Sequence, residues 1–199
     1  MQKITPHLWF DKEAKEAAEF YVSLFPNSKI TNITTLHDTP SGDCDVVSFE
    51  LAGQPFMAIS AGPLFKFNPS VSFHVKCKTK DEVDAMWKKL SGGGKVLMEL
   101  GSYPFSERYV WLQDKYGLSW QLIYVGEMET KQKITPVLLF VGDKTGKAEE
   151  AVNFYASVFK NTKANVLARY GKGEEPDKEG TVKYAAFTLE GMEFGAMDS

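Results

Sequence analysis

Apolar positions recur along the chain with two different periods, and their order predicts its elements. Residues 3–10 alternate between apolar and polar, which predicts a strand, and Asp11 is expected to cap the helix that follows. Apolar residues at spacings of three and four then predict an amphipathic helix over 14–25. Three strands are predicted next, at 29–37, 45–51 and 55–60. The first 62 residues therefore have the order βαβββ.

Much of this pattern occurs again near the end of the chain. The opening QKITPHLWF returns as QKITPVLLF, with Val137 in place of His7. Further on, EFYVSLFPNSK (19–29) matches NFYASVFKNTK (153–163), and FELAGQPFMAIS (49–60) matches FTLEGMEFGAMD (187–198). Matching segments in a fixed order indicate duplicated structure. We therefore expect the last third of the chain to repeat the fold of the first third.

The middle of the chain follows the same plan more weakly. A strand is predicted at 70–77, a helix at 80–90 and three strands at 95–100, 108–113 and 118–125. The chain thus contains three βαβββ repeats, at about 1–62, 70–125 and 132–199. We expect the first two to pair into one complete module over 1–126, and the third to be the first half of a second, incomplete module.

Several motifs carry a resemblance to a known family. ITPHLWF, EAAEFYVSLFPNSKI, GQPFMAISAGP, FKFNPSVSF and DKYGLSWQL resemble the PhnB-like branch of the vicinal oxygen chelate superfamily, which includes glyoxalase I and bleomycin-resistance proteins. The resemblance implies an α+β fold of paired βαβββ modules, with curled sheets forming a cup and helices outside. Some members of the branch are labelled 3-demethylubiquinone-9 3-methyltransferase. The sequence does not support that activity, because SGGGK (91–95) follows a helix instead of preceding one.

Side chains on a strand alternate between its faces, so one anchor assigns the others. If Leu8 and Phe10 pack under the helix, one residue in two on each neighbouring strand faces the cup. The predicted cup-lining residues are Thr5, His7, Trp9, Ser60, Ser72, His74 and Gln121. Trp9 is suited to stack on a flat ligand, although a tryptophan there also fits a cup wall. Ser60 and Gln121 suit a polar ligand, each other or water equally well.

The metal site of the superfamily has no counterpart in this set. The resemblance places its four ligand positions, usually His and Glu, at Thr5, Ser72, Ser60 and Gln121. Hydroxyls and an amide are poor ligands for Zn, Ni or Fe, so no metal and no other cofactor is expected. His7 and His74 lie two residues further along the same strands. They provide an alternative site for a divalent ion, or an acid–base pair, but two imidazoles alone are incomplete.

Two classes of function follow. The first is a metal-free small-molecule binding protein whose cup is lined by the residues above. The alternative is a metal-dependent isomerase, lyase or dioxygenase of the glyoxalase type that uses His7 and His74. No complete catalytic set can be recognised from the sequence, and the composition does not identify the ligand. Whether the chain catalyses a reaction therefore stays open at the level of the sequence.

The composition limits which kinds of partner and which cellular location can be expected. The net charge of −3 gives no reason to expect nucleic acid, and the sequence has no apolar run of transmembrane length and no signal peptide. Cys44 and Cys77 form no CxxC or metal-binding motif, so we expect reduced thiols and a cytoplasmic location. The unpaired third repeat would expose a sheet edge, which predicts a homodimer in which it pairs with another copy. A truncated longer chain is the alternative.

Overall fold

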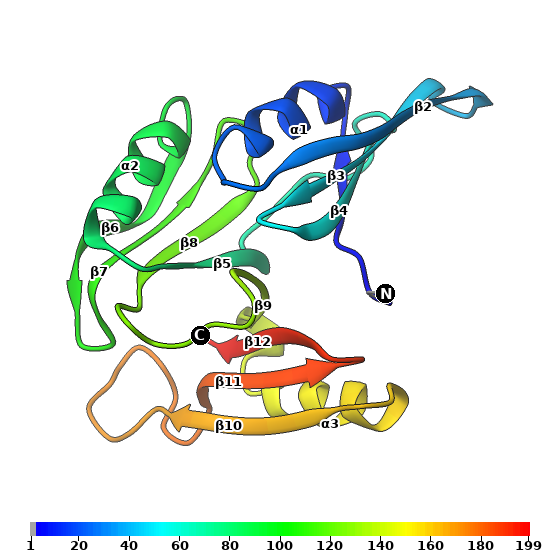
Figure 1. Cartoon of the computed structure of the whole chain (residues 1–199). Coiled ribbons are helices and arrows are strands. Elements are labelled where there is room, and N and C mark those ends of the chain that lie inside the picture. Colours follow the sequence, from blue (N-terminus) through cyan, green and yellow to red (C-terminus); the bar gives the residue numbers. More distant parts are fainter. Residues whose placement is uncertain (1–2) are drawn as a thin grey trace. The chain divides into compact units, whose positions relative to one another are not determined.

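The computed structural model describes residues 3–199, with the backbone alone at 165–167. It confirms the α+β class and the expected order of elements (Figure 1). The first repeat consists of β1 (His7–Phe10), α1 (Ala14–Val22), β2 (Lys29–Thr39), β3 (Gly42–Leu51) and β4 (Gln54–Ser60). The second repeat consists of β5 (Val71–Cys77), α2 (Lys80–Leu90), β6 (Lys95–Tyr103), β7 (Ser106–Gln113) and β8 (Ser119–Tyr124).

The third repeat follows the same order with one short addition. It consists of β9 (Ile134–Phe140), the 3-10 turn η1 (Gly142–Lys144), α3 (Ala148–Val158), β10 (Lys163–Arg169), β11 (Val182–Leu189) and β12 (Met192–Asp198). In the first repeat the strands are ordered β1-β4-β3-β2, and in the third they are ordered β9-β12-β11-β10. The first strand of each repeat runs parallel to the last, and the other pairs are antiparallel. The first and third repeats therefore share one topology.

The chain divides into two compact bodies. The N-terminal body comprises Thr5–Asn68 and Val75–Glu129. The C-terminal body comprises Thr130–Ser199, Pro69–His74 and the chain up to Ile4. Strand β5 therefore contributes to both. Ser70, just before β5, accepts a backbone hydrogen bond from Leu139 on β9 within the C-terminal body, and Cys77, the last residue of β5, accepts one from Val125 within the N-terminal body.

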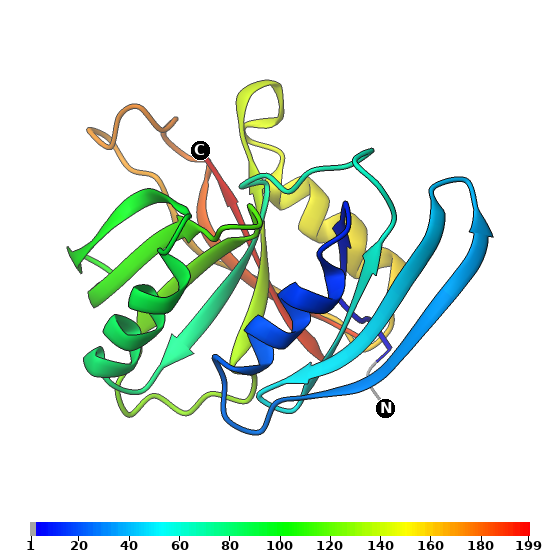
Figure 2. The same ribbon diagram turned by 90° about the horizontal axis from the view of Figure 1, so that it is seen from above.

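Each helix covers one face of a sheet. Helix α1 crosses the sheet of the first repeat, from which β2 and β3 extend as a long hairpin (Figure 2). Its buried residues Ala14, Ala17, Ala18 and Tyr21 form the stripe that the spacing of three and four predicts. Helix α3 packs on its own sheet, where Ala148 and Val152 join a core formed with β11 and β12. One face of each sheet is thus left without a helix of its own repeat.

Strand β2 extends further than the sequence predicts. The predicted strand ends at residue 37, whereas β2 continues to Thr39. Cys44 and Cys77 are both buried and free. None of the helices in the described part of the chain combines the length and the apolar composition of a membrane span.

Candidate functional site

The register between β1 and β4 decides which side chains face away from α1. Leu8 and Phe10 are buried, as predicted for residues under the helix. In the parallel pair, His7 lies beside Met57 and Trp9 beside Ile59. Neighbours in such a pair point to the same face of the sheet. The open face of the first repeat is therefore formed by His7, Trp9, Met57 and Ile59.

Ser60 lies on the face opposite to the predicted one. Its Oγ accepts a hydrogen bond from the backbone N–H of Ala14, the first residue of α1, at 3.1 Å. Strand β4 therefore satisfies one of the backbone donors that a helix leaves free at its N-terminus. This contact also replaces the expected cap from Asp11, because α1 begins only at Ala14. The pairing of β4 with β1 places Ser60 on the helix side of the sheet, and alternation along a single strand does not predict this pairing.

Asp198 occupies the corresponding place in the third repeat. It also accepts backbone hydrogen bonds at the start of a helix, but more of them than Ser60 does. Its Oδ1 accepts hydrogen bonds from the backbone N–H groups of Gly146 (2.8 Å) and Ala148 (3.1 Å). Its Oδ2 accepts one from Val182 at 2.9 Å. Ala148 is the first residue of α3, just as Ala14 is the first residue of α1. The last strand of both repeats thus holds the start of the helix.

Two of the sequence-predicted residues line a hollow: Trp9 lines the one described next, and Ser60 lines a second one near the β2–β3 hairpin. Trp9 Nε1 donates to the carbonyl oxygen of Gly62 at 2.8 Å, and the indole ring meets Phe65 edge-on with centroids 5.0 Å apart. Phe65 is 61% exposed, so this pair lies open to solvent. A hollow of about 380 Å³ extends from it. Its lining includes Trp9, Phe10, Pro63, Phe65, Phe67 and Tyr116, with Lys66 and Lys115 among its charged residues.

Sequence reasoning missed Phe65 and Tyr116 as lining residues. The available signal was the stretch PLFKFNP, in which apolar side chains occur in a segment too irregular for a buried strand. Tyr116 belongs to the DKYG turn that precedes β8. Its hydroxyl donates to Glu16 Oε1 at 2.6 Å, and Lys115 Nζ donates to the same oxygen at 2.7 Å. Burial, with the Glu16 hydrogen bond, raises the pKa of Tyr116 to about 12.

Gln121 lies on β8, next to Trp120 in the sequence and therefore on the opposite face of the strand. Its Oε1 accepts a hydrogen bond from the Tyr109 hydroxyl at 2.6 Å, and Trp111 pairs with it on β7. Gln121 is buried. The amide oxygen therefore already has a strong internal donor. This contact favours a structural role over a direct contact with a ligand.

The other predicted residues lie in different surroundings. Thr5 is partly buried and His7 is exposed, both within the N-terminal body. Ser72 is fully buried and His74 is partly buried, both within the C-terminal body. The His74 ring lies 6.2 Å from the ring of Tyr184, edge-on. Burial raises the pKa of Tyr184 to about 12.

The residues at the superfamily's ligand positions do not fit a divalent ion. Two of the four oxygens already accept internal hydrogen bonds, Ser60 Oγ from Ala14 and Gln121 Oε1 from Tyr109. None of the four is a carboxylate or an imidazole, which are the side chains such ions select. In the described part of the chain, no three His, Cys, Asp or Glu side chains are grouped so that they could hold a metal.

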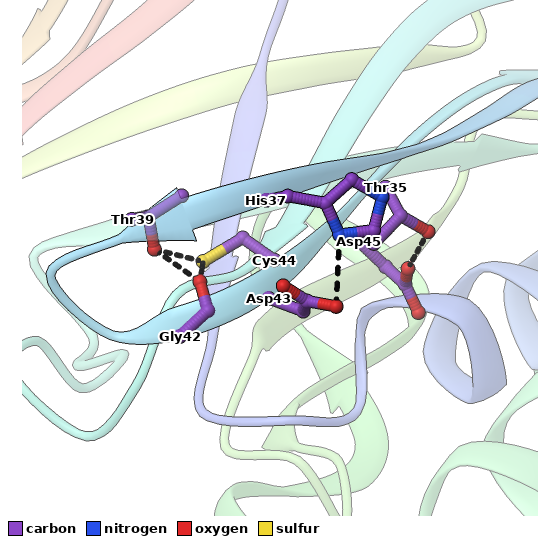
Figure 3. Close-up of polar contacts among 7 residues, drawn as sticks. All are labelled: Thr35, His37, Thr39, Gly42, Asp43, Cys44 and Asp45. Atoms are coloured by element: carbon purple, nitrogen blue, oxygen red, sulfur yellow. Dashed lines mark hydrogen bonds and ion pairs between the residues drawn. The ribbon is translucent and has the colours of Figure 1, made fainter.

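A second hollow, of about 600 Å³, is lined by acidic residues near the β2–β3 hairpin. Its lining includes Asp11, Asp43, Asp45 and Ser60. Figure 3 shows that the hairpin carboxylates have partners of their own. Asp43 Oδ2 lies 2.9 Å from His37 Nδ1, and Asp45 Oδ1 accepts from Thr35 Oγ1 at 2.7 Å. These pairs tie the two strands of the hairpin together.

Asp114 organises a buried cluster that joins the first two repeats. Its Oδ2 accepts from the Tyr21 hydroxyl (2.8 Å) and from Trp120 Nε1 (2.9 Å). Its Oδ1 accepts from the backbone N–H groups of Tyr116 and Leu118. Burial raises the pKa of Asp114 above its ordinary value, while these donors act in the opposite direction. The aspartate of the DKYG turn therefore anchors α1 to the second repeat.

The glycines of SGGGK lie between the end of α2 and the start of β6. A phosphate-binding loop of a dinucleotide fold would instead follow a strand and open a helix. Backbone atoms also crowd Gly94, where an added Cβ would lie 2.2 Å from the Gln113 carbonyl oxygen. Close packing accounts for this glycine without a bound phosphate.

The fold is similar to that of several solved structures, one of which is a glyoxalase I. Glyoxalase I from Zea mays aligns with 98% of this chain and 68% of its own, with a TM-score of 0.60 and 14% identity. A protein from Pseudomonas aeruginosa aligns with 64% of this chain and 100% of its own, with a TM-score of 0.55 and 20% identity. At these identities the likeness shows the fold alone. The molecule therefore has a glyoxalase-like fold.

The sequence identifies the family within that class. The profile of the 3-demethylubiquinone-9 3-methyltransferase family matches residues 2–123 and 132–199, and the chain belongs to this PhnB-like family. A Bacillus cereus protein described as a 3-demethylubiquinone-9 3-methyltransferase, PhnB protein, is 43% identical. It covers 62% of this chain and 100% of its own length, with a TM-score of 0.58. No curated protein matches the chain.

Proposed function

We propose that this chain is a metal-free binding protein for a flat, aromatic small molecule, which it holds at the hollow beside Trp9. The observation that carries the proposal is the Trp9–Phe65 pair, whose rings lie edge to face at the hollow's mouth. The bond from Trp9 Nε1 to Gly62 fixes the orientation of the indole. An indole held in place offers a stacking surface with little further loss of conformational freedom.

The size and lining of the hollow support the same ligand class. About 380 Å³ lies within the range of small-molecule sites, which are mostly apolar with a few polar groups. The hollow's charged lining residues are Asp11, Glu13, Lys66 and Lys115, and of the two lysines Lys115 is already paired with Glu16. Lys66 is therefore the more suitable partner for an anionic substituent on the ligand. An aromatic carboxylate or phenolate combines both features.

The poor fit of the ligand positions to a divalent ion supports binding without a metal. The alternative, a metal-dependent enzyme of the glyoxalase type, would use His7 and His74, which belong to different compact bodies. The family's methyltransferase description would require a site for a methyl donor, and the glycine-rich segment does not have the order of such a site. A cytoplasmic location and a homodimer stay predictions.

A screen by thermal shift, followed by measurement of binding affinity in the natural chain and in variants, tests the proposal. Flat aromatic compounds, among them aromatic carboxylates and antibiotics, are first screened for those that raise the melting temperature of the metal-free chain. For such a compound, Trp9→Ala should weaken binding by about tenfold or more, as loss of an aromatic anchor does. Phe105→Ala removes an exposed aromatic outside the hollow's lining and should leave the affinity unchanged. Binding that survives Trp9→Ala, or that requires an added divalent ion, would contradict the proposal.

A further inference from the structure

Strand β2 forms one edge of the first repeat's sheet, and it is the longest strand that the structure describes. Within the described part of the chain, β3 is its only neighbouring strand. All residues of β2 except Ile30 and Thr39 are exposed. As on any edge strand, every second pair of backbone N–H and C=O groups points away from the sheet, where another strand can pair with it.

The middle of β2 lacks the features that usually protect a sheet edge. Such features are charged side chains, proline, bulges and a short strand. The segment 30–36, ITNITTL, contains neither a charged residue nor a proline. The pairing of β2 with β3 is irregular near both ends of this segment, but it is continuous over 32–36. This regular run, rich in β-branched residues, is therefore suited to accept a further strand.

The other edge strands of the three repeats are short or irregular. Strand β1 has only four residues. The pairing of β6 with β7 shifts register at three places. The pairing of β10 with β11 shifts at two places, and β10 has a basic residue at each end, Lys163 and Arg169. The third repeat, which first suggested a dimer, thus offers a poorer edge than β2.

The outer part of the β2–β3 hairpin extends beyond the sheet as two strands (Figure 2). The pairing of β4 with β3 reaches only to Val46, so the hairpin continues without β4 from there to its turn. A hairpin of two strands is marginally stable by itself in water. Two large apolar side chains on β2 are also exposed, Ile33 at 41% and Leu36 at 44%. A strand added along β2 would cover part of both and give the hairpin a third strand.

We propose that β2 is the contact between two copies of this chain, which pair along it in antiparallel orientation. The charges on the strand favour this orientation, because Lys29 lies at its start and Asp38 near its end. Antiparallel pairing brings Lys29 of each copy close to the partner's Asp38, whereas parallel pairing would place like charges side by side. Lys29 lies 3.6 Å from Glu50 of its own sheet but is still 67% exposed, so its charge is available.

The symmetry of the pair sets its register. The regular run 32–36 is centred on Thr34. A two-fold axis at this point places Thr34 opposite its own copy and Ile33 opposite the partner's Thr35. Residues opposite each other then lie on the same face of the joined sheet, as antiparallel pairing requires. This contact uses the same strand in both copies and so covers both edges at once, which a bound peptide would not do.

Light scattering over a range of concentrations tests the proposal on the full chain, for which a dimer is expected. Thr34→Lys places two positive charges opposite each other on the axis and should raise the dissociation constant of the dimer about tenfold or more. The matched control is Ala164→Lys, at an exposed position of the edge strand β10, which should leave the constant unchanged. An equimolar mixture of Thr34→Lys and Thr34→Glu should dimerise again, because opposite charges then face each other.

Cysteine cross-linking gives a second readout if the charged variants do not fold. Residues opposite each other in an antiparallel pair are close enough for a disulfide. Thr34→Cys should therefore form a covalent dimer on mild oxidation, whereas Ala164→Cys should not. A natural chain that stays monomeric, or a dimer that Thr34→Lys leaves intact, would overturn the proposal. A dimer that Ala164→Lys dissociates would also overturn it, since the third repeat would then provide the contact.

Discussion

The first and third repeats have the same topology, but the last residue of their final strand accepts different numbers of backbone hydrogen bonds. In the first repeat Ser60 accepts one backbone hydrogen bond at the start of α1. In the third repeat Asp198 accepts three, two of them at the start of α3. The resemblance assigns a metal ligand to this position in related proteins, yet in both repeats it holds a helix in place. A carboxylate here is therefore no evidence for a metal.

The open faces of the two repeats differ as well. His7 and Met57 of the first repeat correspond to Val137 and Gly195 of the third. A Cβ at Gly195 would lie 3.0 Å from the hydroxyl oxygen of Tyr184 and 3.0 Å from Val137. The tyrosine thus occupies the space that a side chain at position 195 would need. The third repeat thus has Val137 where the first has His7, and on the same face of its sheet the side chain of Tyr184 fills the space beside Gly195.

The largest expected effect concerns the contact between α1 and the second repeat. Asp114→Ala leaves the buried Tyr21 hydroxyl and Trp120 N–H without their acceptor. We expect a loss of about 3 to 5 kcal/mol in the free energy of unfolding, measured by urea denaturation. Asp143→Ala, at an exposed position, is the control and should change stability by less than about 0.5 kcal/mol. Equal losses in the two variants would show that the Asp114 cluster does not stabilise the fold.

The next effect compares the two strand ends directly. Asp198→Ala removes the acceptor of three backbone N–H groups and should destabilise the α3 region by about 2 to 3 kcal/mol. Ser60→Ala removes one such bond at α1 and should lower the free energy of unfolding by about 1 kcal/mol. Deuterium uptake of the two helix N-termini measures each effect locally. The comparison fails if Ser60→Ala is the more damaging change.

A smaller effect separates two equivalent tyrosines. Tyr21→Phe deletes a buried donor to Asp114 and should cost about 1 to 2 kcal/mol. Tyr155→Phe, at the same place on α3, should change stability by less than about 0.5 kcal/mol. Urea denaturation of both variants under the same conditions checks this. Similar losses would mean that the Tyr155 hydroxyl has an equally important partner.

The smallest effect is a difference between alkaline pH profiles. Burial raises the pKa of Tyr184 from 10.0 to about 12, so the folded state retains this proton where the unfolded state loses it. The contribution is therefore fully present below pH 10 and is lost as the pH rises from 10 towards 12. Tyr184→Phe should lose less stability across this window than the natural chain. Parallel profiles would contradict the inferred burial of the hydroxyl.

The sequence predicts the elements better than the faces. Spacings of three and four located the second helix at 80–90, and the alternation located most strands to within a few residues. Alternation divides a strand into two faces without saying which one meets the helix. The pairing of His7 with Met57 decides this for β4, and it turns Ser60 towards α1. Such a register depends on contacts between residues distant in the sequence.

The candidate site was predicted only in part for the same reason. Trp9 could be chosen from its strand, whereas Phe65 and Tyr116 meet the hollow through loops whose path no periodicity describes. The buried partners of Asp114 could not be predicted from the sequence either, because Tyr21 lies 93 residues away along the chain. Turn chemistry located the aspartate but not its role as an anchor.

Metal analysis tests the central claim most directly, namely that the superfamily's ligand positions stabilise the fold here and that the hollow works without an ion. Untagged protein is purified without chelators, and its metal content is measured by mass spectrometry before and after incubation with Zn, Ni, Mn or Fe(II). We predict no divalent ion near one per chain and no uptake. A stoichiometric ion that is lost in the His7→Ala/His74→Ala variant would contradict the account and favour a glyoxalase-type enzyme.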